Sequence, residues 1–426
     1  MNRPILIYNL FPRLAGHLGQ WTAHAERAQR MGFNWLFINP VQYPGFSGSL
    51  YAVKDFYRLN PAFIPPGSAD PMEDLRRALE VMHGQGLKVM LDLVVNHTSK
   101  DCPLIKEHPT WFRRDRDGNP VSPSAIDPAD ARKVTVWGDL AEVDNAGSGD
   151  RAGLWAYWTA MVQFYLELGF DGFRCDAAYK VPPRLWEQLI GAARRLRPGA
   201  LFAAETLGCR LGEVRALKGV GFDYLFNSSK WWNFDQPWCL EQHTELQSVA
   251  PSIAFPESHD TPRLMAESGG LEAVQKQRYA FAAAFSSGVM VPIGYEHCFT
   301  RPLHVVHSSP EDWEATGHDL RWFIERINRL KVHHPVLGAE GRWEVVTDLD
   351  GPSTVLCKHG GSEDDPVLIV VNKDWRAPQS VPAAPLRRYF RRAPQVLRVF
   401  RQQGAPELLP DGPLALEPAE VIYLLG

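Results

Sequence analysis

One apolar segment of this 426-residue sequence ends in two charged residues whose types and spacing suit nucleophilic chemistry. Arg174 and Asp176 lie two residues apart in the segment GFRCD. On a β-strand this spacing points both side chains to the same face. A neighbouring guanidinium lowers the pKa of a carboxyl group. We therefore expect Asp176 to be ionised and able to attack an electrophilic carbon.

Two further carboxyl groups, those of Glu205 and Asp260, follow later apolar segments. A carboxyl group near other carboxyl groups tends to have a raised pKa, which suits a general acid, so Glu205 is the predicted proton donor. Asp260 can bind hydroxyl groups and stabilise a positively charged transition state. The imidazoles of His97 and His259 are natural hydrogen-bond partners for such hydroxyl groups. This set of side chains is typical of glycosidic bond cleavage.

Strand-like and helix-like segments alternate over roughly the first 330 residues, and they must position these side chains. Strands are expected at 4–10, 33–39, 87–95, 170–175, 200–204, 222–226, 252–256 and 288–293, and helices at 20–31, 71–83, 152–168, 182–195, 211–217, 237–248, 271–286 and 319–333. Eight such units predict an α/β fold of the (β/α)8 TIM-barrel type, in which functional residues collect at the carboxyl ends of the strands. A doubly wound open sheet is the alternative, and it is disfavoured because no Gly-rich phosphate fingerprint follows the first strand.

Two stretches break this alternation. Residues 96–150 are rich in Asp, Pro, Gly and Ser and are too long for an ordinary loop, so they predict a small inserted domain after the third strand. Residues 335–426 contain short β-branched segments separated by Gly, Asp or Pro, which predict a C-terminal antiparallel β-sandwich domain. The catalytic barrel would then comprise residues 1–95 and 151–334.

Four short motifs resemble those of the α-amylase superfamily, glycoside hydrolase family 13. They are DLVVNH (92–97), GFRCD (172–176), AAET (203–206) and ESHDT (257–261), and they match the family in order and spacing. The segment GSLYAVKDFYRLNP (48–61) also resembles the family segment that carries a sugar-stacking tyrosine. The resemblance covers nearly the whole chain, and four ordered motifs are far more specific than any one of them.

The resemblance implies a role for each matching residue. Asp176 would be the nucleophile that forms a covalent glycosyl intermediate, Glu205 the general acid and then base, and Asp260 the stabiliser of the transition state. Substrate would be bound by Tyr51, His97 and His259, and Arg174 would orient the nucleophile. Asp92 and Asn96 would be structural residues near the site. A retaining mechanism of this kind requires the nucleophile and the acid to be about 5–5.5 Å apart.

Some positions depart from common family members. Lys180 lies one residue beyond the position expected for an acceptor-side lysine, and Ser258 precedes His259 in the last motif. Trp231 and Trp232 could form an acceptor-side platform or could equally pack between barrel and helix. We expect Lys180 and Trp232 to bind substrate. Because of these departures, the sequence does not determine the acceptor subsites or, therefore, the substrate.

The expected function is therefore a retaining hydrolase or transglycosidase that acts on α-glucans or maltooligosaccharides. One alternative is a maltosyl- or glucanotransferase of glycogen metabolism, including one linked to maltose 1-phosphate. Another is a non-catalytic, sugar-binding member of the same fold, which the three carboxylates disfavour. Neither linkage, chain length nor acceptor follows from the sequence.

Composition narrows the function classes further. The net charge of −4 lacks the basic excess of a nucleic-acid or membrane-surface binder. No segment approaches 18 apolar residues, and no secretory signal is recognised at the N-terminus. The six cysteines show no metal-binding spacing, so reduced thiols in the cytoplasm are expected.

We expect no cofactor and no metal ion. Asn96 could be a ligand of a structural calcium ion, but such an ion needs six to eight oxygen ligands, and the sequence does not identify the full set. Asn96 is as well explained as a turn residue. The sequence does not indicate the oligomeric state.

Overall fold

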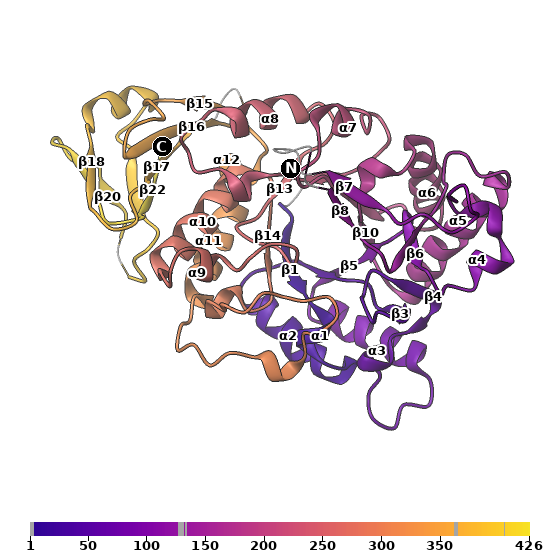
Figure 1. The fold of residues 1–426 in the computed structure, drawn as a ribbon. Coiled ribbons are helices and arrows are strands. Elements are labelled where there is room, and N and C mark those ends of the chain that lie inside the picture. The colour runs from indigo at the N-terminus through magenta and orange to yellow at the C-terminus, as the bar shows by residue number, and fades with distance from the viewer. Residues whose placement is uncertain (1–3, 127–131, 133, 362–364, 404) are drawn as a thin grey trace.

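Eight parallel strands form a closed barrel (Figure 1). The computed structural model describes residues 4–126, 132, 134–361, 365–403 and 405–426. Around the barrel the strands are β1 (Leu6–Leu10), β2 (Trp35–Ile38), β5 (Lys88–Leu93), β10 (Gly172–Cys175), β11 (Leu201–Glu205), β12 (Tyr224–Phe226), β13 (Ser252–Ala254) and β14 (Gly288–Pro292). Pairing of β14 with β1 closes the ring. The predicted (β/α)8 barrel is confirmed. Seven of its eight strands fall within predicted segments, and β11 extends one residue beyond its segment, to Glu205.

Helices surround the barrel. Those at predicted positions are α2 (Leu18–Arg30), α3 (Pro71–Gly84), α5 (Arg151–Leu168), α6 (Pro183–Leu196), α7 (Leu211–Arg215), α8 (Trp238–Leu246), α10 (Glu272–Phe285) and α11 (Arg321–His333). The short helices α1 (Pro12–Ala15), α9 (Leu264–Glu267) and α12 (Pro335–Gly338) were not predicted. Asp70 caps the N-terminus of α3 by accepting from the amides of Met72 and Glu73. In α6, Leu185, Leu189 and other apolar residues at helical spacing face the barrel.

Successive side chains of each strand point into and out of the barrel, and they form two separate apolar regions. Inward-facing side chains such as Phe37, Met90 and Phe226 fill the barrel, while outward-facing ones such as Leu36 and Leu91 pack against the helices. The same alternation continues the inward row of a strand to its carboxyl end. Polar residues at the ends of these rows must therefore face the barrel mouth.

The segment after β5 forms two small antiparallel sheets. Strand β6 (His97–Ser99) pairs with β9 (Leu140–Glu142), and β7 (Ser124–Ile126) pairs with β8 (Val134–Val136). The short helix α4 (Leu104–Glu107) lies in the same segment. Strands β3 (Gln42–Pro44) and β4 (Val53–Leu59) form another small sheet after β2. Strands β3, β4 and β6 and helix α4 lie at the right of Figure 1, and β7 and β8 lie nearer its centre.

The C-terminal region is antiparallel. A six-stranded sheet has the order β15 (Arg342–Val345), β16 (Ser353–His359), β17 (Val367–Asn372), β22 (Val421–Leu425), β19 (Gln395–Arg398) and β20 (Glu407–Leu408), and β18 (Gln379–Val381) pairs with β21 (Leu414–Leu416). One face of the six-stranded sheet joins the main core beside α10, and the other packs against β18 and β21 (Figure 1). The exact division into barrel, inserted domain and C-terminal domain stays a prediction.

Within the described residues, no helix is long and apolar enough to cross a membrane. All six cysteines are described, and all of them are free.

Candidate active site

Strand register brings four charged residues together at the barrel mouth: Asp92, Arg174, Asp176 and Glu205. Arg174 on β10 lies opposite Asp92 on β5, and Glu205 ends the neighbouring strand β11. Gly172 permits the close approach of β10 and β11, because a Cβ there would lie 2.2 Å from the carbonyl oxygen of Leu201. The spacing of Arg174 and Asp176 then points both side chains into the mouth, as the sequence predicted.

Arg174 is the centre of an ion-pair network. Its Nη1 atom donates to Asp176 Oδ1 at 2.8 Å and to the two Asp92 oxygens at 2.9 and 3.0 Å. Burial raises the pKa of Asp92 to about 6, although Arg174 opposes this shift. Breaking a buried ion pair on one side costs about 3–5 kcal/mol, so Asp92 fixes the guanidinium and the guanidinium fixes Asp176.

Glu205 accepts hydrogen bonds from two backbone amides. Its Oε2 accepts from Ala177 at 2.9 Å and its Oε1 from Leu207 at 3.0 Å. Burial nevertheless raises the pKa of Glu205 to about 7, with Arg174 opposing the rise and Asp176 adding to it. A carboxyl group with this pKa can hold a proton near neutral pH and release it during a reaction.

The backbone beside Asp176 adopts a rare conformation. Ala177 has φ 42° in the left-handed region, which costs a non-glycine residue about 1–3 kcal/mol. This conformation directs the Ala177 amide at Glu205. The strain thus lies between the predicted nucleophile and the predicted acid.

Asp260 completes the carboxylate set from the opposite side of the mouth. Its Oδ2 lies 3.0 Å from His259 Nε2 and 3.9 Å from Arg174 Nη2, and its side chain is 50% exposed. Desolvation acts to raise the pKa of Asp260, but His259 and Arg174 outweigh it and hold the pKa at about 2. Asp260 is therefore an anion over the whole physiological pH range.

Tyr51 joins the two sides of the site. Its hydroxyl group donates to Asp92 Oδ2 at 2.6 Å and accepts from Asn39 Nδ2 at 3.0 Å, and its ring stacks on His259 with the centroids 5.8 Å apart. Asn39 is in turn held by Asn9 at 2.8 Å. Sequence analysis missed both asparagines. Their signal was a polar residue near the carboxyl end of an otherwise apolar strand segment.

Two buried imidazole nitrogens in the site have no hydrogen-bond partner: Nε2 of His97 and Nδ1 of His259. Burial lowers the pKa of His97, so its ring is neutral near pH 7. An unsatisfied buried polar atom costs about 1–3 kcal/mol. Such atoms are expected where a bound ligand supplies the partner. Asn96 is also buried, and its carbonyl oxygen accepts from Val143 at 2.9 Å.

A recess at the barrel mouth joins these groups. It is lined by Arg174, Glu205, His259 and Asp260 together with apolar side chains that include Phe37 and Phe226. The lining thus combines charged groups with aromatic rings. This arrangement suits a ligand with hydroxyl groups and an apolar face.

Comparisons with known proteins agree with this geometry. A family model described as the glucanotransferase domain of glycogen debranching enzyme matches residues 2–112. The α-1,4-glucan:maltose-1-phosphate maltosyltransferase of Burkholderia pseudomallei is 28% identical over 395 residues, covering 89% of this chain and 34% of that protein. The protein of the same name from Myxococcus xanthus is 27% identical over 377 residues, covering 78% of this chain and 54% of that protein. The chain thus spans about a third to a half of the length of these relatives.

Solved structures share the fold over almost the whole chain. An α-amylase from Lactobacillus plantarum matches with a TM-score of 0.77 and 21% identity over 99% of both chains. A maltogenic α-amylase from Thermotoga neapolitana matches with a TM-score of 0.74 and 20% identity, again over 99% of both chains. The chain therefore has the barrel fold of these α-amylases, and its sequence is similar to that of the maltosyltransferases above.

Lys180 contacts the segment between β5 and α5. Its Nζ donates to the carbonyl oxygen of Ser124 and lies 5.5 Å from the ring centroid of Trp137. These contacts connect the turn after β10 to strand β7 and its neighbourhood. The acceptor-side role suggested by the superfamily resemblance stays a prediction.

The substrate-binding role predicted for Trp232 is wrong. The Trp232 side chain is fully buried and packs against Phe234, Phe281 and Phe285. Its indole nitrogen donates to the carbonyl oxygen of Gln236 at 2.6 Å. The structure instead bears out the alternative, in which Trp232 packs between the barrel and a helix. A platform role for the half-exposed Trp231 stays a prediction.

Alanine substitutions distinguish the two tryptophans. Trp232→Ala is expected to lower the free energy of unfolding by about 3–5 kcal/mol, because it opens a cavity in an aromatic cluster. Trp231→Ala is the matched control and should change it by less than about 0.5 kcal/mol, since this side chain is 50% exposed. Denaturant unfolding measures both. Equal losses for the two variants would contradict this placement of Trp232.

A buried ion pair supports the segment ESHDT (257–261). Glu257 accepts from Arg263 Nη1 at 2.8 Å and from the Leu264 amide at 2.6 Å, and both charged side chains are 1% exposed. Because Glu257 lies two residues before His259, the pair anchors the backbone that carries His259 and Asp260.

Proposed function

We propose that this chain is a retaining enzyme that cleaves α-glucosidic bonds through a covalent glycosyl intermediate on Asp176. One observation carries the proposal. Asp176 accepts a 2.8 Å hydrogen bond from a buried guanidinium, while Glu205 on the neighbouring strand has a pKa of about 7. One carboxyl group is thus held for attack and the other for proton donation, which is the division of roles that retaining glycosidases need.

The proposed reaction has two steps. In the first, Asp176 attacks the anomeric carbon while Glu205 protonates the glycosidic oxygen, so that the leaving sugar departs as an alcohol. The fixed negative charge of Asp260 stabilises the oxocarbenium-like transition state. In the second step, Glu205 removes a proton from the acceptor, which attacks the same carbon and releases Asp176. Two inversions retain the α configuration.

The acceptor decides between hydrolysis and transfer, and we propose transfer to an α-glucan or maltooligosaccharide. The support is the maltosyltransferase name of relatives that match 78–89% of this chain. We further propose that phosphate can take the place of the sugar acceptor, so that maltose 1-phosphate is a donor or product. Hydrolysis by the same intermediate is the alternative. A non-catalytic, sugar-binding role is disfavoured, because all three carboxylates lie at the barrel mouth.

Product analysis separates these outcomes. The purified chain is incubated with maltohexaose, with and without inorganic phosphate, and the products are separated by chromatography. We expect a redistributed ladder that contains chains longer than the substrate, and maltose 1-phosphate when phosphate is added. Glucose and maltose as the sole products would contradict transfer. An unchanged substrate would contradict the enzymatic proposal itself.

We also propose the division into a barrel of residues 1–95 and 151–334, an inserted domain of residues 96–150 and a C-terminal domain of residues 335–426. The separate sheets of these regions support it. The reaction uses no cofactor, because the side chains named above handle each proton and each bond. Six free cysteines support a reducing compartment such as the cytoplasm.

A further inference from the structure

Three metal-ligating side chains converge on the C-terminal sheet, far along the chain from the barrel residues. Glu344 lies on β15, and Cys357 and His359 lie on β16. The two strands are antiparallel neighbours, and their register sets Glu344 directly opposite Cys357. His359 follows Cys357 by two residues, so its side chain shares the same face. Among the described residues this is the only group of three such ligands found close enough to bind one ion.

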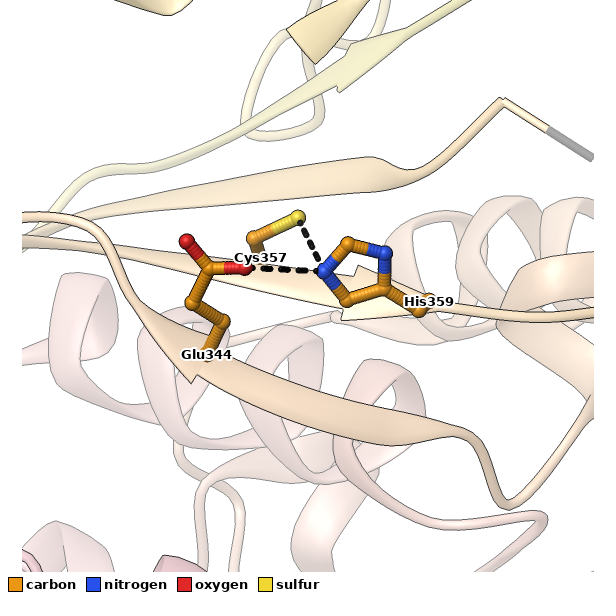
Figure 2. Close-up of side chains that lie close together, drawn as sticks. All are labelled: Glu344, Cys357 and His359. Carbon is orange, nitrogen blue, oxygen red and sulfur yellow. Dashed lines mark hydrogen bonds and ion pairs between the residues drawn. The ribbon is translucent and has the colours of Figure 1, made fainter.

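The contacts of the cluster meet at a single ring nitrogen. Nε2 of His359 lies 3.1 Å from Oε2 of Glu344 and 3.3 Å from Sγ of Cys357 (Figure 2). The second ring nitrogen points away from both partners (Figure 2). A catalytic relay through histidine uses one ring nitrogen for the nucleophile and the other for the carboxylate. This arrangement is therefore no Cys–His–Glu relay.

Without an ion, one ring nitrogen serves both neighbours. If Nε2 is protonated, its one hydrogen bonds Glu344 and leaves the sulfur 3.3 Å away without a separate partner on the ring. If Nε2 is unprotonated, it can accept from the Cys357 thiol, but its lone pair then also faces the carboxylate oxygen. A cation placed among the three atoms would satisfy all of them at once. The ligand atoms all lie within 4.8 Å of one another.

We propose that Glu344, Cys357 and His359 bind one divalent transition-metal ion of the zinc class, with water in a fourth position. Thiolate, imidazole and carboxylate are ligands that Zn²⁺ accepts in tetrahedral sites. Metal–ligand bonds of about 2.0–2.3 Å place neighbouring ligand atoms about 3.3–3.6 Å apart. The present contacts are a few tenths of an ångström shorter, so small outward side-chain movements make room for the ion.

The surroundings of the cluster support binding. The hydroxyl group of Tyr389 lies 3.1 Å from Oε1 of Glu344 and orients the carboxylate from behind, as outer partners of metal ligands do. The side chains of Glu344 and His359 are 40% and 31% exposed, whereas Cys357 is buried. The ion can therefore enter from solvent and finds the thiol at the floor of the site.

Binding converts the thiol into a thiolate ligand. The metal–sulfur bond replaces the sulfur–hydrogen bond, and one proton leaves to solvent. The ion would join β15, the edge strand of the six-stranded sheet, to β16. The proposed site is thus separate from the glycosyl-transfer site and independent of it.

Cobalt spectroscopy tests this site on the full-length, reduced protein after treatment with a chelator. Titration with Co²⁺ is expected to give a thiolate-to-cobalt charge-transfer band that saturates at one equivalent and is abolished by one equivalent of Zn²⁺. Cys357→Ser should abolish the band, and His359→Gln should weaken binding at least about 100-fold. Cys102→Ser and His333→Gln are matched controls from other regions and should leave the titration unchanged.

Two results would overturn the proposal. One is a wild-type protein that shows no charge-transfer band at millimolar Co²⁺. The other is a band that persists in both Cys357→Ser and His359→Gln, because the thiolate would then come from elsewhere. The use of two ligand variants protects the test against a single misfolded protein. Maltooligosaccharide turnover should stay unchanged in both, since neither residue lies at the barrel mouth.

Discussion

Asp176→Asn is expected to lower kcat for maltooligosaccharide turnover by at least about 10⁴-fold. The amide has nearly the shape of the carboxylate and can still contact Arg174, which donates to Asp176 at 2.8 Å. It cannot, however, form the acylal bond to the anomeric carbon. Because the substitution removes the covalent step and leaves the packing intact, substrate binding should change far less than kcat. Steady-state kinetics with maltohexaose measures both quantities.

The matched control for this variant is Asp350→Asn, which makes the same change at an exposed position of the C-terminal region. It should leave kcat within about twofold of the wild-type value. Circular dichroism and the unfolding midpoint show whether each variant is folded. A folded Asp176→Asn protein that retains a tenth or more of the wild-type kcat would contradict the assignment of the nucleophile.

Glu205→Gln is expected to lower kcat by about 10²–10⁴-fold and to change the pH dependence of the reaction. The pKa of Glu205 is raised to about 7 by burial. The acid form needed for protonating the leaving group is therefore present below pH 7 and lost above it. In the wild-type enzyme kcat/KM should fall as the pH rises through about 7. The glutamine variant has no such proton to lose, so this alkaline limb should disappear.

A substrate with a good leaving group isolates the role of Glu205. Fluoride needs little protonation to depart, so Glu205→Gln should lose far less activity with an α-maltosyl fluoride than with maltohexaose. Glu187→Gln, at an exposed position of α6, is the matched control. Equal losses with both substrates would contradict the role of Glu205 as proton donor.

The barrel and its charged centre could be predicted from the sequence because both depend on short-range patterns. Strand-length apolar segments and helix-length amphipathic segments gave the eight units and their order. The two-residue spacing of Arg174 and Asp176 then gave their common face. Asp92 lies near the carboxyl end of β5, Glu205 ends β11, and Asp260 follows β13. The carboxyl ends of parallel strands meet at one mouth, so the whole set was predictable without coordinates.

Features that depend on long-range register or on side-chain direction could not be predicted. Trp232 and Trp231 are adjacent in sequence, yet only the fold turns the first inward and the second outward. Asn39 reaches Tyr51 across the gap between two segments whose packing the sequence does not specify. The pairing of Glu344 with Cys357 depends on the register of two C-terminal strands. Cysteine spacing alone gave no metal motif there.

Trapping the glycosyl intermediate tests the central claim most directly. The enzyme is incubated with a 5-fluoro-α-glycosyl fluoride, whose slow second step lets the intermediate accumulate, and then digested for mass spectrometry. The account predicts one covalent fluoroglycosyl group per chain, on Asp176, and none on the Asp176→Asn variant. A label on another residue, or products of inverted configuration without any label, would contradict it.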